Sequence, residues 1–280
     1  AGRIYERANA SLLFFWKEEH VFDPVMTIKS GQFHHWQEAE GILCAVNGSD
    51  AFFLKDGALI AGDRAAAEVF FDEAHDYDRA ARLVRSAEDL KDLAPYLSLR
   101  ILKQDPWEAV VGFILSSNNN LFRIRKTVLD LSKNYGNKLA EAHGLVAYSL
   151  PAPEVMADLS SDALRALGAG YRDKYLIEVA HMVAAGKWDL SRPYELAYNE
   201  AKKYLMLLPG VGPKVADCIL LFGYGKKDAF PVDVWIARAM KRFGEFKSRE
   251  AASDYAIERF GEDAGYIQQL LFMDQRRRET

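Results

Sequence analysis

Cysteine is scarce in this sequence, because its 280 residues include only Cys44 and Cys218. Two cysteines so far apart in the chain exclude a disulfide framework and a four-cysteine zinc or iron-sulfur site. The six histidines include one adjacent pair, His34 and His35. Neighbours on an extended chain point to opposite faces, and no carboxylate motif frames this pair. We therefore expect no metal site, and any catalysis must use other groups.

Long apolar runs are missing as well. No stretch approaches the roughly 20 apolar residues that span a bilayer, and the first ten residues, AGRIYERANA, lack the basic-then-apolar order of a secretory signal. Half of all residues are apolar, so the chain can bury the core of one large or two smaller domains. The expectation is an intracellular protein without membrane contact.

A strong basic charge is also lacking, since the formal net charge is -4. Its distribution is uneven: residues 1–100 hold 11 basic and 17 acidic side chains, whereas residues 201–245 hold 8 basic and 4 acidic ones. A polyanion such as DNA would therefore bind the later part of the chain. A surplus this small is also compatible with an ordinary solvated surface.

The residue pattern changes from strand-like to helical along the chain. The runs GILCAVNG, DAFFLKDG and ALIAGD are short and apolar and contain Asn-Gly and Asp-Gly, which favour antiparallel hairpins. From DYDRAARLVRSAEDLKDLAPYL onward the apolar spacing is helical almost to the end. The sequence predicts a predominantly helical α+β fold, with an antiparallel sheet domain over residues 1–103 and a helical domain over 104–280.

The segment EAKKYLMLLPGVGPKVADCILLFGYG predicts a helix, a tight turn and a second helix. Gly210 and Gly212 permit positive φ or close approach, and Pro213 suits a first helical position. Main-chain N–H groups at Gly210, Val211 and Gly212 would then bind phosphate without a large basic patch.

A lysine stands in the first turn of the second helix, where a cation is mildly unfavourable. A lysine amine is protonated at neutral pH and is then no nucleophile, but a helix start and a desolvated cleft both favour the uncharged form. Lys214 is therefore a candidate nucleophile. Cys218 lies one turn later, either in the same pocket or as a core residue. Asp233 in FPVDVW is a plausible N-cap whose carboxylate can also stabilise positive charge or accept a proton.

LPGVGPKVADC followed by FPVDVW resembles the helix-hairpin-helix DNA glycosylases, specifically the 8-oxoguanine DNA glycosylase branch of bacterial type. Four further stretches carry the resemblance in the family's order: SGQFHHW (30–36), QDPWEAVVGFILSSNNNLFRI (104–124), GAGYRDKYL (168–176) and AGYIQQLLF (264–272). One departure is Trp235, because eukaryotic members have His after PVDV.

The resemblance implies a role for each matching residue. Lys214 attacks C1′ of a flipped nucleotide and Asp233 stabilises positive charge on the sugar. The main-chain carbonyl of Gly31 accepts a hydrogen bond from N7–H, which 8-oxoguanine has and guanine lacks. The remaining residues bind the flipped base (Cys218, Gln268 and Phe272) or fill the vacated duplex and read the opposite cytosine (Asn118, Arg123, Tyr171 and Arg172).

The implied function is a bifunctional DNA repair glycosylase that excises 8-oxoguanine and nicks the strand by β-elimination. Its expected partner is double-stranded DNA with 8-oxoguanine opposite cytosine, and the protein is expected to be monomeric and to act in a bacterial cytoplasm or a eukaryotic nucleus. The expected reaction requires no soluble cofactor. Whether main-chain atoms of the hairpin bind a cation is left open. Three alternatives also stay open: a noncatalytic DNA-binding module, a glycosylase for another damaged base, and a small-molecule enzyme built on the sheet.

Overall fold

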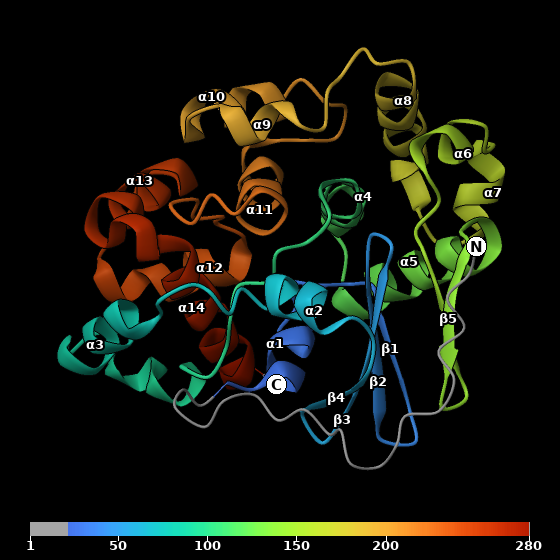
Figure 1. Ribbon diagram of the computed structural model, residues 1–280. Coiled ribbons are helices and arrows are strands. Elements are labelled where there is room, and N and C mark those ends of the chain that lie inside the picture. The colour runs from blue at the N-terminus through green and yellow to red at the C-terminus, as the bar shows by residue number, and fades with distance from the viewer. Residues whose placement is uncertain (1–21, 280) are drawn as a thin grey trace.

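The computed structural model describes residues 22–279, which form an α+β fold dominated by helices (Figure 1). A four-stranded sheet is formed by the N-terminal part of the chain, and the later helices lie around α11 (Pro213–Tyr224). The predicted fold class is therefore confirmed. Within these residues, no helix combines the length and the apolar character needed to cross a bilayer.

The sheet is an antiparallel meander in the order β1-β2-β3-β4. The three predicted strands correspond to β2 (Ile42–Asn47), β3 (Asp50–Lys55) and β4 (Ala58–Ala61). Asp56 and Gly57 join β3 to β4 with φ of 51° and 79°, as a two-residue hairpin turn of the primed type requires.

The first strand of the sheet, β1 (Trp36–Ala39), was not among the predicted strands. It joins β2 through Glu40 and Gly41, both at positive φ. Glu is not among the residues that usually mark such a turn, and WQEA is too polar to suggest a buried strand. The strand forms because β2 offers a long apolar partner to pair with.

A second hairpin corrects the expectation of uninterrupted helix after the sheet. β5 (Lys138–Ala142) and β6 (Leu145–Tyr148) pair antiparallel. The side chains of Leu145 and Ala147 pack against β2 and β3 in one buried cluster with Cys44 and Phe53. The run KLAEAHGLVAY has the two-residue alternation of strands around a His-Gly turn, and this short signal sits between two long helical patterns.

The helical body shares one large apolar core. This core includes buried residues from Tyr77 to Ile101 as well as residues after 104, so the segment 77–101 packs with the later helices, whereas α2 (Arg64–Phe70) packs with the sheet. The division into domains at Lys103 stays a prediction. The helices outside the hairpin and the site are α1 (Pro24–Lys29), α2 (Arg64–Phe70), α3 (Asp78–Ser86), η1 (Lys91–Tyr96), α6 (Pro153–Ala157), α7 (Ser161–Ala166), η2 (Gly170–Arg172), α8 (Asp173–Ala184), α9 (Arg192–Glu195), η3 (Met240–Phe243), α13 (Arg249–Phe260) and η4 (Gly261–Asp263).

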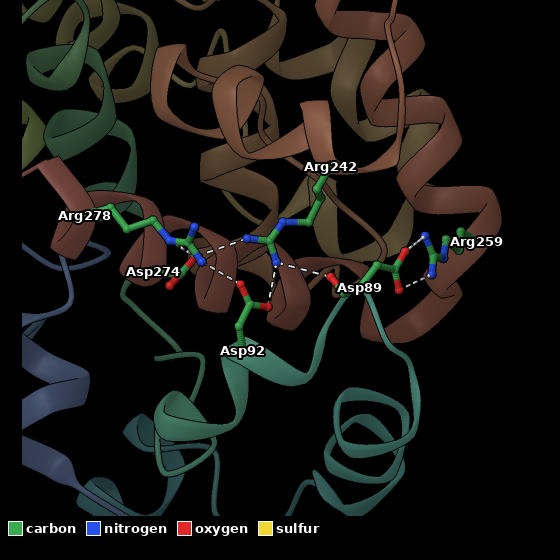
Figure 2. Close-up of polar contacts among 6 residues, drawn as sticks. All are labelled: Asp89, Asp92, Arg242, Arg259, Asp274 and Arg278. Carbon is green, nitrogen blue, oxygen red and sulfur yellow. Dashed lines mark hydrogen bonds and ion pairs between the residues drawn. The ribbon is translucent and has the colours of Figure 1, made fainter.

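An ion-pair network joins the α3–η1 region to the C-terminal helices (Figure 2). Arg242 of η3 bridges Asp92 of η1, at 2.9 Å, and Asp274 of α14 (Ala264–Glu279), at 3.1 Å. Arg259 of α13 pairs with Asp89 at 2.8 Å. Each partly exposed pair contributes at most about 1 kcal/mol, so the network mainly fixes the orientation of α14.

A buried carboxylate connects the sheet side to the helical core. Asp72, which follows α2, accepts a hydrogen bond from Tyr77 at 2.8 Å and pairs with Lys103 at 2.9 Å and with Lys227. Burial alone raises the pKa of the Asp72 carboxyl, but hydrogen bonds from Lys103 and Lys227 outweigh burial and hold that pKa below its ordinary value. Asp72 therefore stabilises the fold in its charged form.

We expect Asp72→Asn to lower the free energy of unfolding at pH 7 by about 3 kcal/mol, since it leaves two lysines without their shared anion. A carboxyl with a depressed pKa stabilises fully above its unfolded pKa, about 4, and loses that contribution as pH falls through the folded value. The deficit of the variant should therefore shrink below about pH 4. Urea unfolding at pH 7 and pH 3 measures this, with Asp158→Asn at an exposed position as the control; an equal deficit at both pH values would contradict it.

Candidate active site

The predicted helix-turn-helix is formed by α10 (Tyr198–Leu205) and α11. Gly210 has φ of 79°, and a Cβ there would lie 2.7 Å from the ring of Tyr175, so only glycine fits. The N–H of Val211 donates to the carbonyl of Leu208 at 3.1 Å. Within the described part of the chain, the N–H groups of Gly210 and Gly212 donate to no partner. The turn thus offers two main-chain donors just before the start of α11.

Lys214 lies in the first turn of α11 and is half-buried. Its Nζ lies 3.5 Å from Oγ of Ser116, the last residue of α4 (Pro106–Ser116). No carboxylate of residues 22–279 forms an ion pair with it. The amine is therefore neither in open solvent nor neutralised by a fixed counter-ion.

Cys218 follows Lys214 by one helical turn and is buried. Burial raises the pKa of its thiol to about 11, although the nearby charge of Lys214 opposes this. At neutral pH Cys218 is consequently a thiol, small and polarisable, beside the amine.

Asp233 caps α12 (Val234–Ala239), as the sequence suggested. Its Oδ1 accepts hydrogen bonds from the N–H groups of Trp235, at 2.9 Å, and Ile236, at 2.8 Å. Oδ2 has no hydrogen-bond partner in the described residues. The cap therefore fixes the carboxylate through one oxygen and leaves the other uncommitted.

A cavity of about 480 Å³ collects most of the predicted site. This volume is in the range of small-molecule and cofactor sites. Its wall comes from the segment around Gly31, the α4–α5 junction, α11, the start of α12, and α14. The predicted residues that line it are Gly31, Lys214, Cys218, Asp233, Gln268 and Phe272.

Gly31 lies close to α14. Its φ is 97°, and a Cβ there would lie 3.0 Å from both the ring of Phe272 and the side chain of Leu121. The neighbouring Gln32 fixes this backbone, because its side chain donates to the carbonyl of Arg100 at 2.9 Å and accepts from the N–H of Leu102 at 2.8 Å. A residue from the N-terminal part thus forms one wall of a cavity in the helical core.

Gln268 is buried and has one satisfied polar atom. Its Nε2 donates to the carbonyl of Pro231 at 3.1 Å, whereas its Oε1 has no partner among the described residues. A buried acceptor without a partner costs about 1–3 kcal/mol, so a ligand that donates to Oε1 would recover that energy.

Sequence reasoning did not assign several polar residues of the wall to this cavity, among them His34 and Arg276. His34 packs edge-on against Phe113 at 5.8 Å, and burial, followed by the charge of Lys214, lowers its pKa to about 3. His35 instead contacts Glu108 at 3.2 Å. No cluster of three or more metal-ligating side chains occurs in residues 22–279. Arg276 could have been found from its spacing, since it follows Phe272 by four residues on the same helix.

Three of the residues predicted to contact the vacated duplex lie outside this cavity. Asn118 is exposed, with φ of 49°, in the turn before α5 (Leu121–Tyr135). Tyr171 is 54% exposed and its hydroxyl donates to the carbonyl of Ser117 at 3.3 Å. Arg123 is exposed on the first turn of α5.

Arg172, the fourth of these residues, is only 6% exposed. Its guanidinium donates to the carbonyls of Ser117 at 2.8 Å, Asn118 at 2.9 Å and Ala169 at 3.3 Å. In this arrangement Arg172 holds the turn that carries Asn118, and few of its five N–H donors remain for a nucleobase.

Residues 111–261 match the sequence model of the HhH-GPD superfamily of base excision DNA repair proteins. The chain belongs to this superfamily. Its region of similarity contains the hairpin, Lys214 and Asp233, whereas Gly31 and the α14 residues lie outside it.

Relatives of this HhH-GPD protein agree with that assignment. A probable N-glycosylase/DNA lyase of Methanothermobacter thermautotrophicus is 34% identical over 63% of this chain, and the N-glycosylase/DNA lyase of Saccharomyces cerevisiae is 38% identical over 51% of it. These alignments cover 62% and 41% of the two relatives. The Clostridium acetobutylicum 8-oxoguanine glycosylase/lyase, solved with DNA containing cytosine opposite 8-oxoguanine, has a TM-score of 0.86 at 28% identity, over 93% of this chain and 94% of its own.

The two arginines predicted to read the opposite cytosine should differ in their effect on the stability of this HhH-GPD protein. Arg172→Lys removes the planar fork that bonds three carbonyls, so we expect it to lower the free energy of unfolding by about 2 kcal/mol. Arg123→Lys, at an exposed position, should change it by less than about 0.5 kcal/mol. Urea unfolding of both variants checks this, and equal effects would show that Arg172 does not hold the turn.

Proposed function

We propose that this protein is a bifunctional DNA glycosylase/lyase that removes 8-oxoguanine from duplex DNA. The observation that carries the proposal is the position of the Lys214 amine, which lines one cavity with the carboxylate of Asp233 and the ring of Phe272. An amine, a carboxylate and an aromatic ring in a cavity of this size fit covalent catalysis on a flipped nucleoside.

The chemistry begins with attack by the amine of Lys214 through its nitrogen lone pair. Its nitrogen forms a bond to C1′ as the C1′–N9 bond breaks, and the base leaves with that electron pair and takes up a proton. The carboxylate of Asp233 stabilises positive charge on the sugar during this exchange. The nitrogen then loses a proton and its lone pair forms the C=N bond of the Schiff base as the C1′–O4′ bond opens. O4′ keeps the electron pair of that bond and takes up a proton.

The Schiff base permits the second step. It acidifies the C2′ proton, and removal of that proton expels the 3′ phosphate and nicks the strand by β-elimination. Neither step requires an oxidant, a reductant or a soluble cofactor. A cation bound by main-chain oxygens at the hairpin would act only by holding phosphate.

The rest of the site suits the substrate. Phe272 offers a ring for stacking and Gln268 a buried amide for the Watson–Crick edge, while the carbonyl of Gly31 accepts from N7–H. The open N–H groups of Gly210 and Gly212 suit a backbone phosphate. Asn118 and Tyr171 would contact the space that the flipped nucleotide leaves in the duplex. Arg123 and Arg172 would contact the opposite cytosine. The protein would act as a monomer wherever the genome is, in the cytoplasm of a bacterium or the nucleus of a eukaryote.

A noncatalytic helix-hairpin-helix module accounts for the glycines of the turn but not for a lysine and a carboxylate that line the same cavity as Phe272. A small-molecule enzyme built on the sheet has no recognisable phosphate loop, nucleophile triad or metal motif in the sequence. A glycosylase for a different damaged base shares most of the site, and substrate comparison separates it.

Lys214→Gln should abolish covalent trapping. Borohydride reduces a Schiff base, so the wild-type protein is expected to cross-link to 8-oxoguanine duplex and the variant to lose excision by about four orders of magnitude or more while still binding DNA. Lys203→Gln, an exposed lysine of α10, is the matched control and should cross-link normally. Cross-linking by Lys214→Gln would refute the assignment of the nucleophile.

The wild-type protein should prefer 8-oxoguanine among damaged bases. A site that bonds N7–H rejects guanine by about 10⁴-fold or more, because the carbonyl then faces a lone pair and stays unpaired. Single-turnover excision from matched duplexes with 8-oxoguanine, guanine, 3-methyladenine and thymine glycol measures the preference. Faster removal of an alkylated purine or an oxidised pyrimidine would favour the related glycosylase instead.

A further inference from the structure

Three residues on one face of α14 line the cavity at four-residue spacing: Gln268, Phe272 and Arg276. The sequence places Arg276 in a run of three arginines that would normally be a solvated helix end. Arg277 is indeed exposed, and Arg278 pairs with Asp274 and Asp92 at the surface (Figure 2). Arg276 alone of the three lines the cavity.

The guanidinium of Arg276 lies beside Gly31. Its Nη1 is 3.5 Å from the position that a Cβ of Gly31 would occupy, next to the ring of Phe272. Gln268 and Arg276 are two helical turns apart, about 12 Å along the axis. They therefore face different edges of a base that stacks on Phe272, with Arg276 at the edge that the Gly31 carbonyl reads.

We propose that Arg276 is a specificity-determining residue that donates a hydrogen bond to O8 of flipped 8-oxoguanine; this inference rests on the function proposed above. In 8-oxoguanine the C8 carbonyl and N7–H are adjacent, one accepting and the other donating. Arg276 supplies donors only, and the carbonyl of Gly31 supplies an acceptor next to it. Together they complement both atoms that oxidation changes.

Guanine mismatches this pair at both atoms. It presents a C8–H, which accepts no hydrogen bond, to the guanidinium and a lone pair at N7 to the Gly31 carbonyl, so the bond from Arg276 is lost and the carbonyl stays unpaired. A guanidinium has five N–H groups, so a bond to O8 is compatible with other contacts of Arg276. Hydrogen bonds from a charged donor are stronger than neutral ones, and this one would form in a cavity partly shielded from water.

The test compares binding of bases in a background that cannot turn over. Lys214→Gln is combined with Arg276→Leu or, as the control, with Arg277→Leu, which removes the same charge from an exposed neighbouring position. Affinities are measured for duplexes that carry 8-oxoguanine, guanine or a tetrahydrofuran abasic analogue, each opposite cytosine. Thermal unfolding establishes that the variants are folded.

Arg276→Leu should weaken binding of the 8-oxoguanine duplex by about 10- to 100-fold and leave the abasic duplex nearly unchanged. Arg276→Lys, which keeps a donor, should recover part of this loss. Arg277→Leu should change both affinities slightly and equally, through the loss of a surface charge.

Equal weakening on the abasic duplex would overturn the inference, because Arg276 would then contact phosphate or support the fold. An unchanged preference for 8-oxoguanine in Arg276→Leu would overturn it alone and leave the proposed function intact. If the Lys214→Gln parent does not distinguish 8-oxoguanine from guanine, the proposed function and this inference fall together.

Discussion

The rest of the site depends on a lysine held at the start of a helix inside a cavity. The position of Lys214 follows from the turn before it, where Gly210 approaches the ring of Tyr175 too closely for any side chain. The same turn leaves the N–H groups of Gly210 and Gly212 open. One short glycine-rich loop therefore sets both the place of the amine and the position of two main-chain donors without a partner in the described residues.

The cavity around Lys214 is assembled from segments far apart in the chain. Gly31 reaches it from the N-terminal part and Phe272 from the last helix, and the two are in close contact. The geometry of such a site depends on the contacts that hold its walls in place. Gln32 fixes the loop of Gly31 to residues 100–102, and the network of Arg242 fixes α14 against η1.

The polar groups that line the cavity differ in how many hydrogen bonds they form within the protein. Asp233 has one carboxylate oxygen bound by the α12 cap, and Gln268 has a bonded Nε2 and an unpartnered Oε1. His34 is neutral because burial and the charge of Lys214 disfavour its cation. The cavity wall is thus polar, and some of its polar atoms have no hydrogen-bond partner among the described residues.

The sequence by itself determined the elements with strong local signals. Turn residues such as Asp56 and Gly57 marked the strands, and Pro213 and Asp233 marked the helix starts that position the hairpin and the carboxylate. The spacing of Gln268 and Phe272 placed both on one helix face. Weak local signals failed, and so β1 and the β5–β6 hairpin were found only in the structure.

The tertiary structure alone decided which side chains meet. It turned Arg276 to the cavity but left Arg277 at the surface, and it committed Arg172 to main-chain carbonyls. Neither outcome is local, because periodicity and turn chemistry describe neighbours along the chain. The contacts of Gly31 with α14 join residues more than 240 positions apart, and such contacts depend on how the whole core packs.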